Sequence, residues 1–359
     1  MVRVDSQTEQ RLFALLRSAL FSATESVELF TNLTTTDWQR LYDLSLAQGV
    51  LAFAYDGMKQ LSEECQPDIE LKIQWAYNIN HIEKVYAHQL SVAKALTKTF
   101  AENDIQTLIL KGLSLSALYP VPSHRQCGDI DIYLMGGYQR GNAIAEQRGA
   151  KVKYDYFVHS EFAIKGIDIE NHQYFVNPTV NSTGAYVESA LQRLVVNSTA
   201  HPIVDSALTP SPTFNTLFLA RHSSWHFARE SITLRDICDW AVLLSRCNGD
   251  MDSKEIMQLL QESGLERYAA IITTIAVKYL GITSPLPFTE SYETLAERVK
   301  SDIINHDAIK SDTLFGKIRN RITRKWCYDL VVPDGYINNI WYSVKGYLQR
   351  PFAIFKIKL

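Results

Sequence analysis

Two aspartates spaced two residues apart, Asp129 and Asp131, are the residues of this sequence best suited to chemistry. They alternate with Ile130 and Ile132 in the run DIDIYL, which predicts a β-strand with the acids on one face and the isoleucines in the core. Neighbouring carboxylates repel each other, so the pair is unfavourable unless a cation joins it. Hard divalent ions such as Mg²⁺ or Mn²⁺ bind such oxygen ligands together with the oxygens of a bound triphosphate. The pair therefore predicts a metal site, the plainer alternative being a solvated strand face.

A second alternating run, IDIENH at Ile167–His172, predicts another strand with Asp168, Glu170 and His172 on one face. If this strand lies beside the first, a third carboxylate reaches the same site. Three carboxylates suffice for two metal ions that orient a triphosphate and neutralise charge during attack at phosphorus. Asp168 and Glu170 compete for that role. His172 is expected to be a structural partner of the carboxylate, the alternative being a catalytic base.

The segment before the aspartates offers groups that can hold phosphate. Asp104–Leu110 predicts a buried strand that ends at the turn Lys111-Gly112, and a short helix follows. Such a turn presents backbone N–H groups to phosphate oxygens. Lys111 is either a phosphate contact or an ion-pair partner of the aspartates, and the planar fork of Arg125 suits bidentate phosphate binding.

The order of these motifs resembles the DNA polymerase β-like nucleotidyltransferase superfamily. More narrowly, it is similar to a bacterial group of uncharacterised nucleotidyltransferases, and the similarity covers most of the chain. The motifs that carry it are LKGLSLSALYP with the following Arg125, GDIDIYL, IENH, the pair Asp37-Trp38, His226 and the phrase LRDICDW at Leu234–Trp240.

The resemblance implies that Asp129, Asp131 and Glu170 are the catalytic metal ligands. It also implies a set of nucleotide-binding residues, namely Lys111, Gly112, Ser114 and Arg125. The implied reaction moves a nucleoside monophosphate from an NTP such as ATP to an unidentified acceptor and releases pyrophosphate. The superfamily usually has adjacent Gly and Ser, whereas Leu113 intervenes here. Whether Ser114 or Lys111 meets the γ-phosphate, and whether turnover is retained, is therefore open.

Two other functions compete with nucleotidyl transfer. A sugar-nucleotide glycosyltransferase with a D-x-D motif and Mn²⁺ accounts for the aspartate pair but leaves the Lys-Gly turn without a role. A non-catalytic nucleotide-binding module accounts for the same residues without turnover. Residues 310–359 contain ten lysines and arginines and three aspartates. This basic segment permits nucleic-acid binding but is equally suited to docking on the rest of the chain.

The remaining pattern predicts an α+β protein with a small mixed-sheet unit between helical regions, and the resemblance implies that this unit is the nucleotidyltransferase core. Residues 1–100 are expected to be helical, 101–200 to form the α/β core and 201–359 to form a second helical region with the basic tail. A long helix is predicted to follow Pro67-Asp68 and to run to about Phe100, with apolar residues from Ile73 onward at a 3.6-residue period. A hairpin is predicted to turn at Lys165-Gly166. On Leu234–Arg246, Arg235 and Asp239 are spaced to pair, or else to form a wall of the acceptor pocket.

Composition excludes several classes of protein. The 359 residues are 46% hydrophobic with a net charge of −3, so no overall attraction to nucleic acid or anionic membrane is expected. Five scattered cysteines are typical of reduced thiols, and Cys127 is not expected to be a nucleophile because nearby acids raise a thiol pKa. Charges interrupt the N-terminal apolar residues, and no apolar run spans a membrane. We therefore expect a soluble cytoplasmic protein.

Overall fold

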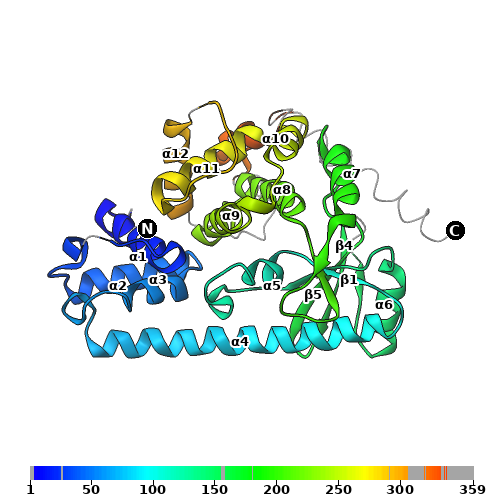
Figure 1. Cartoon of the computed structure of the whole chain (residues 1–359), viewed down its shortest axis with the longest axis horizontal. Coiled ribbons are helices and arrows are strands. Elements are labelled where there is room, and N and C mark those ends of the chain that lie inside the picture. The colour runs from blue at the N-terminus through cyan, green and yellow to red at the C-terminus, as the bar shows by residue number, and fades with distance from the viewer. Residues whose placement is uncertain are drawn as a thin grey trace.

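A computed structural model of the chain describes residues 4–25, 27–154, 158–179, 181–290, 292–305, 319, 321–332, 335 and 337. Helices gather on both sides of one mixed sheet, and one long helix runs beneath them (Figure 1). The α+β class predicted from the sequence is confirmed.

The sheet has seven strands in the order β3-β4-β5-β2-β1-β7-β6. Strand β5 pairs parallel with β2, and β1 pairs parallel with β7, while the other neighbours are antiparallel. The predicted turn at Lys165-Gly166 joins β4 to β5, and both residues have positive φ, as a two-residue hairpin turn requires. The strands are β1 (Thr107–Ile109), β2 (Ile130–Tyr133), β3 (Lys153–Tyr154), β4 (His159–Ile164), β5 (Ile167–His172), β6 (Thr199–Ala200) and β7 (Ala207–Thr209).

In the described part of the chain, three α-helices precede the long one: α1 (Ser6–Phe21), α2 (Thr35–Ala47) and α3 (Leu51–Met58). Helix α2 begins with a capping box between Thr34 and Asp37. Helix α3 carries no amphipathic signal because almost all of its residues are apolar and buried, for example Phe53 at 2% exposure. Periodicity alone could not separate such a segment from a buried strand.

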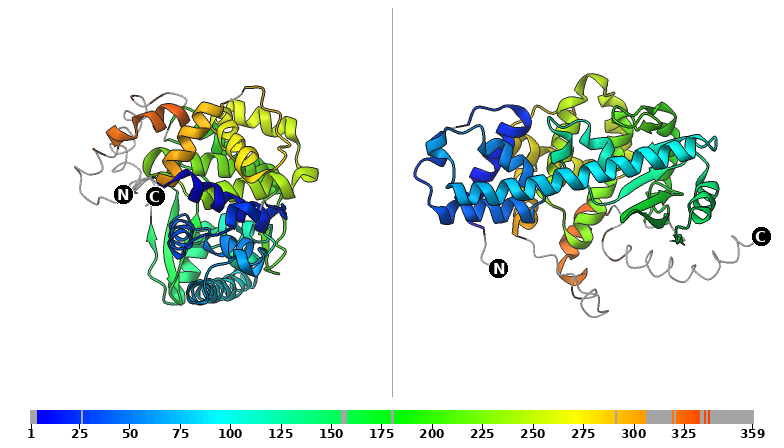
Figure 2. Two further views of the ribbon diagram at one scale, coloured as in Figure 1. Left: turned by 90° about the vertical axis from the view of Figure 1, so that its left-hand side faces the viewer. Right: turned by 90° about the horizontal axis from the view of Figure 1, so that it is seen from below.

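Helix α4 (Ile69–Ala101) connects the N-terminal helices to the sheet, as Figures 1 and 2 show. Asp68 caps its first turn by accepting a hydrogen bond from the Leu71 backbone N–H. The predicted bounds are confirmed, but the predicted stripe is partly wrong, because Ile73 is 62% exposed while Trp75 is fully buried. The C-terminal half of α4 packs with β1, β2 and β5 in one hydrophobic cluster. One face of the sheet is therefore covered by α4, and the opposite face remains for the acids.

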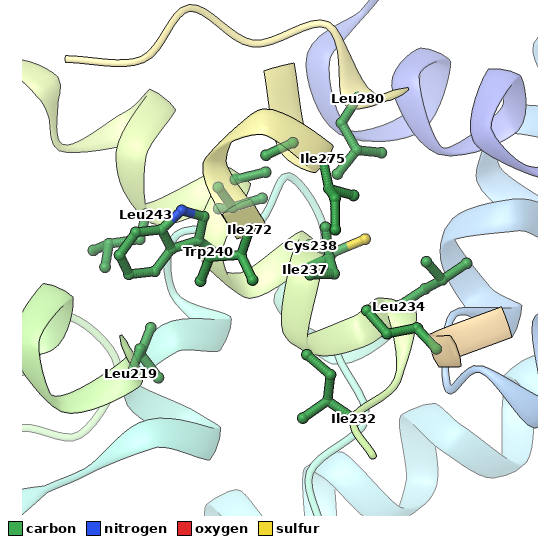
Figure 3. Close-up of a cluster of buried hydrophobic side chains, with 14 of the residues drawn as sticks. Leu219, Ile232, Leu234, Ile237, Cys238, Trp240, Leu243, Ile272, Ile275 and Leu280 are labelled. Atoms are coloured by element: carbon green, nitrogen blue, oxygen red, sulfur yellow. The ribbon is translucent and has the colours of Figure 1, made fainter. Parts of the chain in front are cut away.

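The helices after β1 are α5 (Lys111–Ser116), α6 (Tyr138–Gln147), α7 (Gly184–Leu194), α8 (Pro212–Glu230), α9 (Leu234–Arg246), α10 (Ser253–Glu262), α11 (Glu266–Leu280), α12 (Glu293–Asn305) and α14 (Lys325–Val331). In the core between α9 and α11, Trp240 lies near Leu243 and Ile272, and its indole N–H donates to Thr273 (Figure 3). The N- and C-terminal helices share one core, since the rings of Phe13 and Tyr279 are 4.9 Å apart.

Gly57 on α3 determines how closely α1 and α3 approach. A Cβ atom at this position would lie 2.2 Å from the backbone oxygen of Leu15 on α1. Because a backbone atom cannot rotate away, we expect Gly57→Ala to lower the free energy of unfolding by about 1–3 kcal/mol, the usual cost of overpacking. Urea unfolding measures this loss. Gly249→Ala is the control, since its Cβ would meet no atom within 4 Å. Equal losses for the two variants would refute this account of the packing.

Most of the predicted basic segment, residues 310–359, lies outside the described part of the chain. Among the residues described, no helix has the length and apolar character needed to cross a membrane.

Candidate active site

The two acid-bearing strands lie side by side. In the parallel pair of β2 and β5, Asp131 is in register with Glu170. Ile130 and Ile132 pack in the hydrophobic cluster between the sheet and α4. Because side chains alternate along a strand, Asp131 points to the opposite face of the sheet. Ligand oxygens of Asp129, Asp131 and Glu170 all lie within 4.8 Å of one another. The parallel pairing of two segments nearly forty residues apart thus creates one group of three carboxylates.

Two cations offset this negative charge. Nζ of Lys111 lies 2.8 Å from Oδ1 of Asp131, and Nε2 of His172 lies 3.0 Å from the same oxygen. Burial alone would raise the pKa of Asp131, but Lys111 and His172 outweigh it and hold that pKa far below its usual value. Burial lowers the pKa of His172, yet its hydrogen bonds to Asp131 and Glu170 raise it to about 9. The predicted role of His172 as a carboxylate partner is therefore confirmed.

Asp129 lies at the edge of the cluster and differs from Asp131 electrostatically. Burial and then the charge of Asp131 raise the pKa of Asp129 to about 6. A carboxylate that is costly to ionise beside another carboxylate is stabilised by any cation that joins both.

The competing acid Asp168 takes a different position. It lies two residues before Glu170 on the same face of β5, and it is exposed. Within the part of the chain that the structure describes, Asp168 belongs to neither potential ligand group. The strand register therefore favours Glu170 as the third carboxylate.

The Lys111-Gly112 turn leaves the sheet directly beside the acids. The Leu110 N–H donates to the Asp131 carbonyl, and Lys111 then has a φ of 40°. Gly112 has φ 9° and ψ −101°, so a sharp bend precedes the rest of α5. Such strain in a lysine costs free energy and is characteristic of functional sites. Lys111, the ion-pair partner anticipated as one alternative, also lines the cavity next to the acids.

Ser114 and Arg125 have partners outside the carboxylate group. The Ser114 hydroxyl is buried and hydrogen-bonded to the Thr209 hydroxyl of β7. Arg125 is 6% exposed and makes a bidentate pair with Asp239 of α9, with distances of 2.8 and 2.7 Å. Tyr119 donates a further hydrogen bond of 2.7 Å to Asp239. Contact of Ser114 or Arg125 with phosphate stays a prediction, and for Arg125 it must coexist with this pair.

The predicted pairing of Arg235 with Asp239 is wrong, because Asp239 is occupied by Arg125. Arg235 instead donates to the Gln126 carbonyl at 3.4 Å. It lines a small cavity of about 100 Å³ that also contacts Lys111, Gly112, Arg125, Asp129 and Asp131. The position of Arg235 therefore agrees with the alternative of a pocket wall.

The pKa of the Cys127 thiol is raised, as predicted, but the main cause differs from the one expected. Burial raises the pKa of its thiol, while Arg125 opposes the rise and Asp239 adds to it. The thiol is thus unsuited to nucleophilic attack because it is desolvated, and the acids at 129 and 131 are not its main influence.

His124, the last residue of the 3₁₀-helix η3 (Pro122–His124), anchors the segment that leads to Arg125. Its side chain bonds to Asp56 of α3 and lies 3.1 Å from Oε1 of Glu83 on α4. Burial lowers the pKa of His124, but the bonds to Asp56 and Glu83 outweigh burial, so the pKa is raised above its ordinary value of 6.5.

This raised pKa makes the contribution of His124 depend on pH. The stabilisation is fully present below about pH 6.5, the unfolded value, and is lost as pH rises through the folded-state pKa. We expect His124→Asn to lower the free energy of unfolding by about 1.5 kcal/mol near pH 6 and by less near pH 9. Urea unfolding of wild type and His124→Asn at both pH values measures the difference in unfolding free energy between them. The contributions of the other histidines are the same in both proteins and drop out of this difference. A difference that is independent of pH would contradict this role.

A cavity of about 630 Å³ lies between the acid-bearing strands and α8. From the sheet side it is lined by Lys111, Asp129, Glu170 and His172, and from the α8 side by Phe218, Arg221, His222, Trp225, His226 and Arg229. Carboxylates, a lysine and a basic helix face thus surround one space large enough for a nucleotide.

Comparison with protein-family models matches residues 34–281 to a family described as uncharacterised nucleotidyltransferase. The chain belongs to this family. The matched region includes both acid-bearing strands, the Lys111-Gly112 turn and α8. Comparison with curated proteins and with solved structures gives no match.

Two groups in this nucleotidyltransferase were not anticipated from the sequence. His159 of β4, with Glu170 and His172, forms a second set of potential ligand atoms within 4.8 Å of one another. Arg221 and Trp225 on α8 line the main cavity. The available signal was their spacing of four residues, which places both on one helix face, but only the sheet opposite shows what that face contacts.

Proposed function

We propose that this nucleotidyltransferase moves a nucleoside monophosphate from an NTP to an acceptor hydroxyl, with Mg²⁺ or Mn²⁺ bound by Asp129, Asp131 and Glu170. The observation that carries the proposal is the convergence of these three carboxylates, which come from β5, from β2 and from the residue before β2, beside a cavity that Lys111, Asp129 and Glu170 line. In the reaction, the acceptor oxygen bonds to the α-phosphorus, the bond from that phosphorus to the bridging oxygen breaks, and pyrophosphate leaves.

The donor set fits a hard divalent ion. All three ligands are carboxylates, and Asp129 and Glu170 are partly exposed and line the cavity. A cation bound to them would offset the repulsion between these neighbouring negative charges. When bound, such an ion would neutralise charge on the triphosphate and on the leaving pyrophosphate.

The protein's own groups have distinct roles in this proposal. Lys111, held by Asp131, places a positive charge beside the phosphates, and the Lys111-Gly112 bend lets backbone approach them. Glu170 lines the cavity and supplies a carboxylate oxygen that accepts the proton of the acceptor hydroxyl. Most of the acceleration then comes from positioning and charge neutralisation.

Labelled nucleotides test the proposal directly. The protein is incubated with each NTP labelled at the α-phosphate, with Mg²⁺, Mn²⁺ or chelator, and pyrophosphate release and label transfer are measured with cell-extract fractions as acceptor source. We expect metal-dependent NTP binding and transfer of the α-label. Transfer of a labelled sugar from a UDP-sugar would instead establish the glycosyltransferase alternative, and metal-dependent NTP binding without transfer to any fraction would establish the binding module.

A further inference from the structure

Helix α8 presents one basic and aromatic face to the cavity. Phe218, Arg221, Trp225 and Arg229 follow one another at spacings of three or four residues, and all of them line the cavity. In Figure 1, α8 lies above the sheet that carries β5. The carboxylates and this helix face are therefore opposite walls of the same space.

Arg221 is the unusual residue of this face. It is 6% exposed, and its guanidinium makes no hydrogen bond or ion pair with any residue that the structure describes. Its partner is the ring of Trp225, whose centroid lies 5.3 Å away. Burial lowers the pKa of Arg221 to about 10. A buried guanidinium without an acidic partner is costly to the fold.

Other buried arginines of this chain do not carry that cost. Arg125 is paired with Asp239 at 2.7 Å, and Arg324 with Asp302 at 2.9 Å. Asp129 and Glu170 line the same cavity. Among the described residues, neither of these acids forms an ion pair with the Arg221 guanidinium. Within the described part of the chain, Arg221 therefore lines the cavity without an ion pair.

The chemistry of the group identifies the ligand class. A guanidinium offers a rigid fork of N–H donors that matches two phosphate oxygens, and the Trp225 ring 5.3 Å away gives it a cation–π contact. Of the other basic groups, Lys111 is engaged with Asp131 and Arg125 with Asp239, while Arg229 is exposed and lies over the same Trp225 ring. Arg221 is thus the group best placed to receive an added anion.

We infer that Arg221 binds a phosphate group in the cavity, across from the carboxylates. That the ligand is a phosphate rests on the proposed function. The phosphate comes either from the NTP itself or from a phosphate-bearing acceptor, and both sources present the same oxygens to the guanidinium.

The test combines binding with stability, because the two readouts separate a binding residue from a structural one. Inorganic phosphate is titrated by calorimetry into wild type, Arg221→Gln and the control Arg267→Gln, which removes an exposed charge from α11. For Arg221→Gln we expect at least about a 10-fold loss of phosphate affinity with an unchanged or higher melting temperature, since an unpaired buried charge is removed. Arg267→Gln should match wild type.

Arg221→Lys provides the second variant. It keeps the charge but loses the fork, so its phosphate affinity should lie between those of wild type and Arg221→Gln. Two results would overturn the inference. One is wild-type phosphate affinity in both folded variants. The other is a melting temperature several degrees lower in Arg221→Gln together with wild-type phosphate affinity in Arg221→Lys.

A final arm distinguishes the two sources and separates this inference from the proposed function. Phosphate is titrated into protein saturated with a non-hydrolysable NTP and Mg²⁺. Competition assigns Arg221 to the NTP phosphates, and binding alongside the NTP assigns it to the acceptor. Asp129→Asn should keep Arg221-dependent phosphate binding, so a failure of metal-dependent transfer would leave this site standing.

Discussion

Replacing Asp129 with asparagine should reduce metal-dependent nucleotidyl transfer by more than about 100-fold while leaving the fold at least as stable as wild type. The loss is expected because charge that develops on phosphate is stabilised by few preorganised groups, each worth about 100- to 1000-fold. The stability is expected because burial and Asp131 already disfavour the ionised Asp129 side chain, whose pKa is raised to about 6. Initial rates of α-label transfer and urea unfolding measure the two effects.

Asp131→Asn should lose as much activity but should also destabilise the protein. Its carboxylate is 2% exposed and contacts Lys111 at 2.8 Å and His172 at 3.0 Å, and both cations would lose their partner. Asp168→Asn is the matched control, because Asp168 lies on the same face of β5 but outside the cluster. Full activity in Asp129→Asn, or inactivity confined to Asp168→Asn, would refute the assignment of the ligands.

Of the substitutions proposed, one that breaks the buried pair between Arg125 and Asp239 should cause the largest loss of stability. Both side chains are at most 7% exposed, and two hydrogen bonds of 2.7 and 2.8 Å join them. Arg125→Met leaves the Asp239 carboxylate buried with only Tyr119 as a donor, so we expect the free energy of unfolding to fall by about 3–5 kcal/mol.

The double variant Arg125→Met, Asp239→Leu separates charge burial from packing. Removing both charges should restore most of the lost stability, because an apolar pair of similar volume is often neutral relative to a buried ion pair. Urea unfolding of the two single variants and the double variant completes the cycle. Additive losses in the double variant would contradict the pairing as the source of the effect.

Local sequence pattern was sufficient for the elements that carry the acids. Alternation in DIDIYL and IDIENH predicted two strands, and the structure has β2 and β5 there, with Ile130, Ile132 and Ile169 in the core. The Lys165-Gly166 hairpin and the start of α4 after Asp68 were also predicted, because turns and helix starts depend on residues within a few positions of each other.

Partners far apart in the chain could not be predicted in this way. Arg125 and Asp239 are separated by more than a hundred residues, and the helical spacing of Arg235 suggested a different pair. The long stripe of α4 was misassigned at Ile73 for the same reason, since the face that is buried depends on which helices pack against it.

The sequence by itself determined the chemistry available to this protein. It has acids that alternate with apolar residues in two strands, a Lys-Gly turn before them and helices on either side. Only the tertiary structure decided which groups meet. It brought Glu170, and not Asp168, beside Asp131 through strand register, and it placed the unpaired Arg221 across the cavity from them. The reason is that side-chain direction follows from short-range backbone geometry, whereas ion pairing and burial depend on long-range packing.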